Sequence, residues 1–120
     1  MAGRKLPQNL DAEMSVLSAC LLMKSAADKV CEEMIPDMFF SDANRKIFEA
    51  IFNLHENKKP IDMTTLTNEL EKDNTLALIG GLEYLSVVVD SIVSAANLEY
   101  YINIVQEKYL RRRLLEVSTK

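Results

Sequence analysis

The sequence predicts an all-α fold: a compact domain of about six helices that ends in a long C-terminal helix. Its 120 residues include only three Gly and three Pro, and so few turn formers argue against a sandwich of many strands. Apolar residues make up 48% of the chain and recur at three- and four-residue steps, the spacing typical of helices that bury one face. Charged residues make up 27%, close to the globular average, so a packed domain is favoured over a disordered chain.

Three helices are predicted in the first half of the chain. The first begins at Asn9, whose side chain can accept hydrogen bonds from the free amides of the first turn. The second begins near Ser25 and ends before Pro36, and the third begins at Ser41. The residues expected to face the core are Leu10, Met14, Leu17 and Leu21 in the first helix, Phe39 and Phe40 in a connection, and Ile47, Phe48, Ile51, Phe52 and Leu54 in the third helix.

The second half contains one ambiguous segment. Asp62 is placed to cap a short helix, and the residues from Asn74 to Gly81 form a turn region. Residues 82–89 contain three consecutive valines and could form a strand, but their apolar spacing favours a helix, with Leu82, Leu85 and Val89 facing the core. The longest periodic segment follows from Asn97 to Val117.

Charge and cysteine content limit the functional classes. The net charge of −4 opposes a role in coating DNA, which requires a basic face. No apolar run is long enough for a signal peptide or a membrane span, and two isolated cysteines do not make a disulfide framework. A cytoplasmic protein with reduced thiols is expected.

The sequence predicts no catalytic, cofactor or metal site. The pair Gly80 and Gly81 is not followed by the Lys-Ser or Lys-Thr of a phosphate loop. His55 has no second ligand at metal spacing, so a solvated or helix-capping role is favoured. Cys20 and Cys31 have no histidine paired with them, and buried thiols are favoured over a nucleophile or ligand.

Three consecutive arginines, from Arg111 to Arg113, lie near the end of the last predicted helix. Three roles stay open for them. Cations near a helix C-terminus interact favourably with its dipole, an arginine can reach an acidic protein partner, and a nucleic-acid contact is the third alternative.

A series of short motifs follows a fixed order along the chain. These motifs are Leu6-Pro7-Gln8-Asn9-Leu10-Asp11-Ala12-Glu13, Val16-Leu17, Met38-Phe39-Phe40, Ile47-Phe48, Pro60-Ile61-Asp62 with Leu66, Gly80-Gly81 with Tyr84-Leu85, Ser94-Ala95-Ala96-Asn97, Tyr100-Tyr101, Ile104-Val105 and Arg112-Arg113. Their order resembles the N-terminal domain of DnaB-type bacterial replicative DNA helicases. The resemblance covers residues 6 to about 115, and its specificity comes from the shared order of motifs that are each weak alone.

The resemblance implies a non-catalytic collar domain that mediates hexamer assembly and primase binding during DNA replication. It implies an N-terminal extension at residues 1–8, the helical domain at 9–96, and a long helix at 97–120 that forms the first arm of a helical hairpin. The second arm, a linker and an ATPase domain that binds ATP and magnesium would belong to a longer parent helicase. Expected partners are primase, other copies of the chain and a helicase loader, with little or no direct DNA binding.

Candidate interface residues are side chains that the predicted helix patterns do not place in the core. Asp11, Tyr84 and Leu115 are the candidates for primase binding, because an interface anchor is typically an aromatic or long apolar side chain rimmed by charge. Tyr84 is expected at the edge of the core with a solvated hydroxyl, Asp11 is expected to be exposed in the first turn of its helix, and Leu115 is expected to be uncovered near the end of the last helix. The candidates for self-association are on the last helix: Tyr101, Val105, Tyr109 and Arg112.

Two alternative functions stay open at this point. One is a stand-alone helicase-binding module, such as the helical domain at the primase C-terminus, and the other is a small DNA-binding helical domain that uses the C-terminal arginines.

Overall fold

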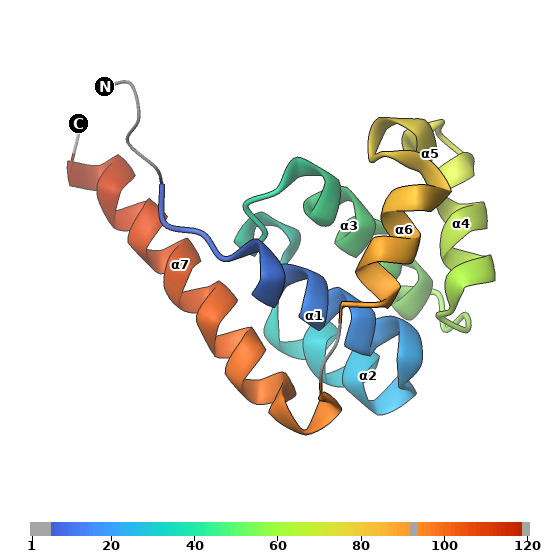
Figure 1. Ribbon diagram of the computed structural model, residues 1–120, viewed down its shortest axis with the longest axis horizontal. Coiled ribbons are helices and arrows are strands. Elements are labelled where there is room, and N and C mark those ends of the chain that lie inside the picture. The colour runs from blue at the N-terminus through green and yellow to red at the C-terminus, as the bar shows by residue number, and fades with distance from the viewer. Residues whose placement is uncertain (1–5, 92–93, 119–120) are drawn as a thin grey trace.

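The computed structural model describes residues 6–91 and 94–118 and is all-helical over these residues, which confirms the predicted fold class (Figure 1). The α-helices are α1 (Leu10–Leu22), α2 (Lys24–Glu33), α3 (Asp42–Glu56), α4 (Met63–Glu71), α5 (Thr75–Leu78), α6 (Gly81–Val89) and α7 (Leu98–Ser118). Two 3₁₀ turns, η1 (Pro36–Met38) and η2 (Ala95–Asn97), complete the described elements. The short α5 occupies the predicted turn region. Residues 1–5 of the predicted extension and 119–120 of the predicted last segment lie outside the described residues.

Three of the predicted helix starts are confirmed by side-chain caps. Asn9 accepts a hydrogen bond from the Ala12 amide at 2.9 Å, and Ser41 accepts one from the Asn44 amide at 3.2 Å. Asp62 forms a capping box at the start of α4. The predicted start of the second helix is wrong by two residues, because an extended Met23, not Ser25, is the capping residue that ends α1 and begins α2, without a side-chain cap.

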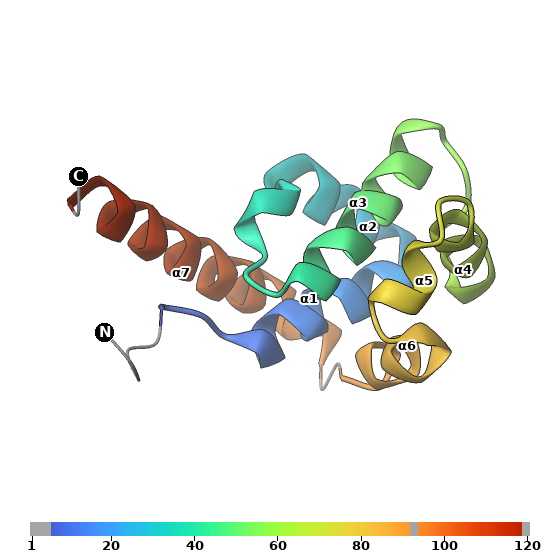
Figure 2. The same cartoon turned by 90° about the horizontal axis from the view of Figure 1, so that it is seen from above.

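Helix α1 lies at the centre of the fold, between α7 on one side and α2, α3 and α6 on the others (Figures 1 and 2). It is buried from Ala12 to Leu21 except for a half-buried Met14, as expected for a helix surrounded by others. The prediction that Leu10 faces the core is wrong, since its side chain is 41% exposed at the start of the helix.

The segment with three valines is helical, as its spacing predicts, but its buried face differs from the prediction. Leu85 and Val88 are fully buried, whereas Leu82 is exposed and Val89 is only half-buried. The turn before α6 depends on Gly80, whose φ of 110° is accessible to glycine but strained for other residues.

Helix α7 crosses the domain along α1 and then extends past it (Figure 2). Its first half completes the core with Leu98, Ile102 and Val105. Phe39, next to η1, is fully buried against Phe48 as predicted, with ring centroids 5.0 Å apart.

Candidate functional site

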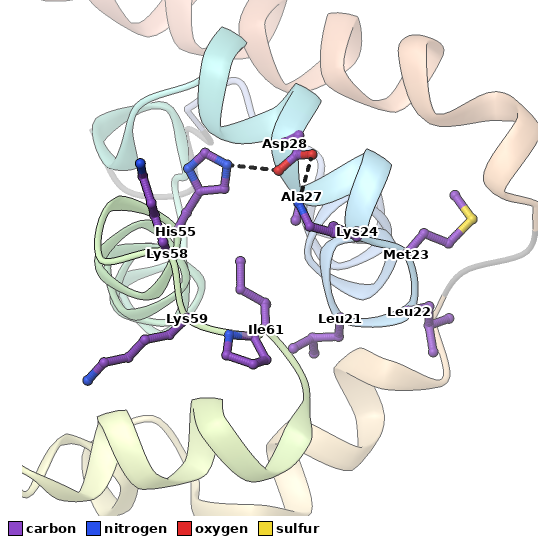
Figure 3. A pocket seen from close by; sticks show the side chains of 11 residues that line it. Leu21, Leu22, Met23, Lys24, Ala27, Asp28, His55, Lys58, Lys59 and Ile61 are labelled. Carbon is purple, nitrogen blue, oxygen red and sulfur yellow. Dashed lines mark hydrogen bonds and ion pairs between the residues drawn. The ribbon is translucent and has the colours of Figure 1, made fainter.

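The side chains of the types that most often act in catalysis or bind metals, His55, Cys20 and Cys31, are hydrogen-bonded or buried. His55 Nε2 lies 3.0 Å from Asp28 Oδ1, which joins the end of α3 to α2 (Figure 3). This hydrogen bond, more than any other contact, holds the pKa of Asp28 below its ordinary value, and Lys24 lowers it further. The sequence missed this pair, because the two residues are far apart in the chain.

Both cysteines are free and buried, as predicted. Burial raises the pKa of the Cys31 thiol to about 11 and that of Cys20 still further, so neither thiol ionises readily. Within the described ranges, no cluster of three His, Cys, Asp or Glu side chains could hold a metal ion. The same ranges contain no helix with the length and apolarity needed to cross a membrane.

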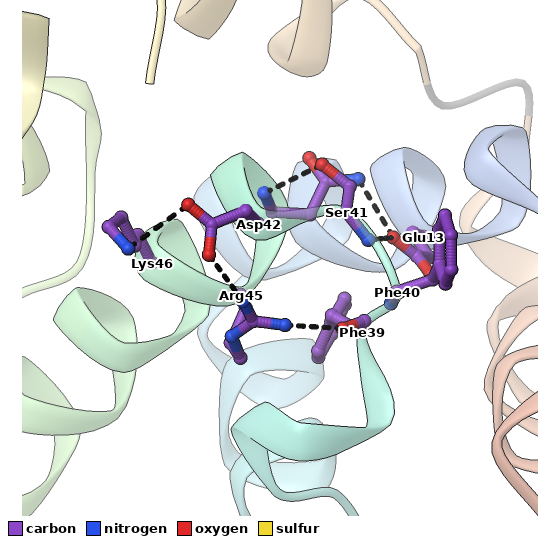
Figure 4. Close-up of polar contacts among 8 residues, drawn as sticks. Glu13, Phe39, Phe40, Ser41, Asp42, Arg45 and Lys46 are labelled. Atoms are coloured by element: carbon purple, nitrogen blue, oxygen red, sulfur yellow. Dashed lines mark hydrogen bonds and ion pairs between the residues drawn. The ribbon is translucent and has the colours of Figure 1, made fainter. Parts of the chain in front are cut away.

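A buried carboxylate organises the region around the start of α3. Glu13 of α1 is 1% exposed. It accepts hydrogen bonds from the backbone amides of Phe40 at 2.7 Å and Ser41 at 3.3 Å, and from Asn44 Nδ2 at 3.0 Å (Figure 4). The sequence indicated only that an acid would favour the start of a helix, and nothing in the local pattern identifies these distant donors.

Tyr84 extends this network. Its hydroxyl donates a hydrogen bond to Asn44 Oδ1 at 2.5 Å. Burial raises the pKa of the phenol above its ordinary value, although hydrogen bonds to Ser41 and Asn44 oppose this effect. The prediction of a solvated Tyr84 hydroxyl is therefore wrong, while the predicted position at the edge of the core is consistent with a half-buried ring.

The other two candidates for primase binding lie on different helices. Asp11 is exposed in the first turn of α1. Leu115 is 40% exposed near the end of α7, where it lines a shallow pocket with Leu6 and Arg112. The three candidates thus come from α1, α6 and α7, and Tyr84 alone belongs to the Glu13 network.

Arg112 is used within the domain. Its Nη1 donates to the carbonyl oxygen of Pro7 at 2.8 Å and its Nη2 to that of Met38 at 3.0 Å. The guanidinium also lies over the rings of Phe40, at 5.3 Å, and Tyr109, at 5.9 Å. This arginine therefore ties the N-terminal segment and η1 to α7.

The neighbouring arginines have other contacts. Arg111 pairs with Glu107 one turn earlier at 3.5 Å. Arg113 lies over the Tyr109 ring at 5.9 Å. These contacts are an ion pair and ring packing within α7, and they test none of the three roles that the sequence left open.

The candidates for self-association divide by burial. Val105 is 2% exposed, so its prediction as an interface contact is wrong for a folded domain, because its side chain already fills the core. Tyr101 and Tyr109 are half-buried on the same inward side. Leu115 was predicted to be exposed, but the sequence prediction overlooked the other exposed apolar residues of α7, which are Tyr100, Leu110, Leu114 and Val117. The sequence did contain a signal for them, because α7 has more apolar residues than a single buried stripe of a helix can hold.

Known proteins match this chain closely. Residues 5–107 match the family model described as the DnaB-like helicase N terminal domain. The replicative DNA helicase DnaC of Bacillus subtilis is 41% identical over 113 residues, which are 94% of this chain and 25% of that protein. The replicative DNA helicase DnaB of Mycobacterium leprae is 40% identical over 118 residues, 98% of this chain and 20% of that protein. The chain therefore spans a quarter or less of the length of these curated relatives.

Solved structures give the same result. The N-terminal domain of DnaB helicase from Mycobacterium tuberculosis superposes with a TM-score of 0.92 at 40% identity, covering 96% of this chain and 82% of that one. The N-terminal domain of DnaB helicase from Helicobacter pylori, described with its interactions with primase, gives a TM-score of 0.79 at 25% identity, covering 91% and 85%. On its sequence and its fold, the chain belongs to the DnaB-like helicase N-terminal domain family.

Proposed function

We propose that this domain works by binding, as the collar of a replicative DNA helicase that docks primase and helps to assemble the ring. The observation that carries this proposal is the likeness of the whole fold to the Helicobacter pylori domain, which is described with its interactions with primase. Unwinding driven by ATP and magnesium is assigned to another part of the helicase polypeptide. The domain itself contributes no catalytic step.

The primase-binding surface is proposed around Tyr84, with contributions from Asp11 and Leu115. The half-buried ring of Tyr84 on α6 offers the aromatic contact of this surface. Glu83 adds charge on the same helix. An apolar anchor with a charged rim is the usual composition of an energetically important interface region.

Calorimetric titration with the primase C-terminal domain of the same organism tests this surface. Tyr84→Ala should weaken binding by about 2 kcal/mol, the scale of a strong interface truncation. Tyr84→Phe separates the two roles of the side chain, because it removes the hydrogen bond to Asn44 and keeps the ring. Glu32, exposed on α2 and outside the proposed surface, provides the control Glu32→Ala. Wild-type affinity in a folded Tyr84→Ala variant would place the interface elsewhere, and no binding by the wild type would contradict primase docking.

Assembly is proposed to use the outward face of α7. Tyr100, Leu110 and Leu114 are exposed there, and a helix with this much exposed apolar surface gains stability when a partner covers it. Sedimentation should show a weak dimer for this chain alone and a monomer for Leu114→Ser. A stable hexamer at micromolar concentration, or dimerisation unaffected by Leu114→Ser, would contradict this arrangement.

Three further expectations complete the proposal: a helicase loader as an additional partner, a cytoplasmic location, and little or no direct contact with DNA. The last is supported by the internal contacts of Arg112 and the pairing of Arg111 with Glu107. A DNA titration over a range of salt concentrations distinguishes the alternatives, because binding through phosphates weakens steeply with salt. Tight, salt-sensitive binding near physiological ionic strength would favour the DNA-binding alternative.

A further inference from the structure

A pocket of about 780 Å³ lies between the junction of α1 with α2 and the loop that joins α3 to α4 (Figure 3). Its volume is in the range of sites that hold ligands or partner side chains. The apolar part of its lining includes a buried Leu21 and Ala27 and a half-buried Ile61. Two exposed apolar side chains, Leu22 and Met23, extend this surface beyond the pocket.

The backbone keeps the pocket open. Only Met23 separates α1 from α2, and its extended conformation turns the chain sharply so that Leu22 faces outward. On the opposite side, Lys58 adopts a left-handed conformation with φ of 56°, and the Lys59 amide donates to the Leu54 carbonyl at 2.9 Å. The loop is therefore anchored to the end of α3, which holds the two walls apart.

The charge of the rim is opposite to that of the chain as a whole. Lys24, Lys58 and Lys59 line the pocket with one acid, Asp28, which leaves a local charge of +2 when His55 is neutral, in a protein of net charge −4. Asp28 is already engaged by His55 and by Lys24, at 3.0 and 3.4 Å. Lys58 and Lys59 form no ion pair with any residue in the described part of the chain.

We propose that this pocket is a docking site for an acidic peptide segment of another protein, in which carboxylates flank a bulky apolar side chain. The apolar side chain enters the space between Leu21 and Ile61, and the carboxylates pair with Lys58 and Lys59. A methionine beside the pocket suits this role, because its flexible side chain adapts to different apolar shapes. Carboxylate pairing at the rim supplies selectivity for an acidic segment.

This site is separate from the surfaces in the proposed function. Asp11 and Leu22 are near opposite ends of α1, about 17 Å apart along the helix at 1.5 Å per residue. None of the candidates for primase binding or self-association lines the pocket. Substitutions in the pocket lining leave the residues of those two surfaces unchanged, so this inference is tested separately from them.

Selection of short random peptides displayed on phage tests the inference without assuming a sequence. Peptides selected on the wild-type domain should be enriched in Asp and Glu on both sides of Leu, Ile or Phe. A selected peptide, synthesised and added to ¹⁵N-labelled domain, should shift the amide signals of residues 21–28 and 55–61. Its fully amidated analogue, with Asn and Gln replacing the acids, should bind more weakly.

Two variants and a control complete the experiment. Lys59→Glu should weaken binding of the selected peptide by about fivefold, the upper end of the range for an exposed ion pair. Leu22→Ser, on the exposed apolar margin, should also weaken it without unfolding the domain. Lys72→Glu makes the same charge change at the end of α4, away from the pocket lining, and should leave affinity unchanged.

Several outcomes would overturn the inference. Selected peptides without acidic enrichment, or equal affinity for the amidated analogue, would exclude recognition by charge. Shifts that fall elsewhere in the domain would exclude this pocket. Signals of residues 21–28 and 55–61 that respond to protein concentration, with no peptide binding, would identify the surface as a contact between copies of the chain.

Discussion

Removal of the buried Glu13 carboxylate is the most informative test of how this domain is held together. Glu13→Ala leaves three donors without their acceptor: the amides of Phe40 and Ser41 and the side-chain amide of Asn44. A buried donor left without a partner costs about 1 to 3 kcal/mol. Asn44 is fully buried and cannot be hydrated without opening the core, whereas Ser41 is half-buried and closer to solvent. We expect Glu13→Ala to lower the free energy of unfolding by about 4 kcal/mol.

The isosteric change Glu13→Gln refines this test. Glutamine keeps one oxygen acceptor but directs an NH₂ group toward backbone donors, so we expect a smaller loss of about 2 kcal/mol. Glu32, exposed on α2, provides the control Glu32→Ala, which should change stability by less than about 0.5 kcal/mol.

Urea unfolding followed by circular dichroism measures these differences, with the slope m checked for constancy so that shifts in midpoint report stability. A Glu13→Ala variant within about 1 kcal/mol of the wild type would refute the reasoning, because the three donors would then have found equivalent partners. The same conclusion would follow if Glu13→Ala and Glu32→Ala were equally stable.

Two further predictions follow from backbone conformation and from the Asp28 pair. Gly80→Ala should destabilise the domain more than Gly81→Ala, because a Cβ at Gly80 would lie 3.0 Å from Tyr84 Cβ at a φ of 110°. A Cβ at Gly81 would have nothing within 4 Å, and only the φ of 72° would be unfavourable. Thermal unfolding compares the two variants, and equal losses of stability would contradict the steric argument. The pKa of Asp28 is lowered chiefly by its hydrogen bond with His55. The ionised carboxylate should therefore stabilise the fold at pH values above the unfolded-state pKa of about 4. This contribution should disappear as the pH falls through the lower folded-state pKa. Wild type and Asp28→Asn should therefore differ in stability near neutral pH and converge in acid, and a constant difference across the pH range would exclude this linkage.

The helix starts could be predicted from the sequence because their causes are local. Asn9, Ser41 and Asp62 each satisfy amides within three residues of themselves, so the signal and the structure lie in the same few residues. The start of α2 lacked such a signal. It depends on the extended conformation of Met23 at a corner shared by two helices, and the prediction placed the capping residue two positions too late.

The buried face of a short helix could not be predicted in the same way. In α6, the periodicity of the apolar residues is compatible with either Leu82 or Val88 facing inward. The choice depends on how α6 meets α1, a contact between segments far apart in sequence. The same limitation applies to α7, where apolar residues cover both an inward face that includes Val105 and an outward face that includes Leu114.

Tyr84 shows how the candidate site depends on contacts that no local pattern contains. The sequence indicated a spare aromatic side chain at the edge of the core, and its ring is half-buried there. Its hydroxyl, however, binds Asn44, whose amide in turn binds Glu13 in the centre of the fold. A substitution at Tyr84 therefore acts on stability through the hydroxyl and on any partner through the exposed part of the ring. Because Tyr84→Phe changes only the first and Tyr84→Ala changes both, the difference between these variants, rather than either value alone, measures the contribution of the surface.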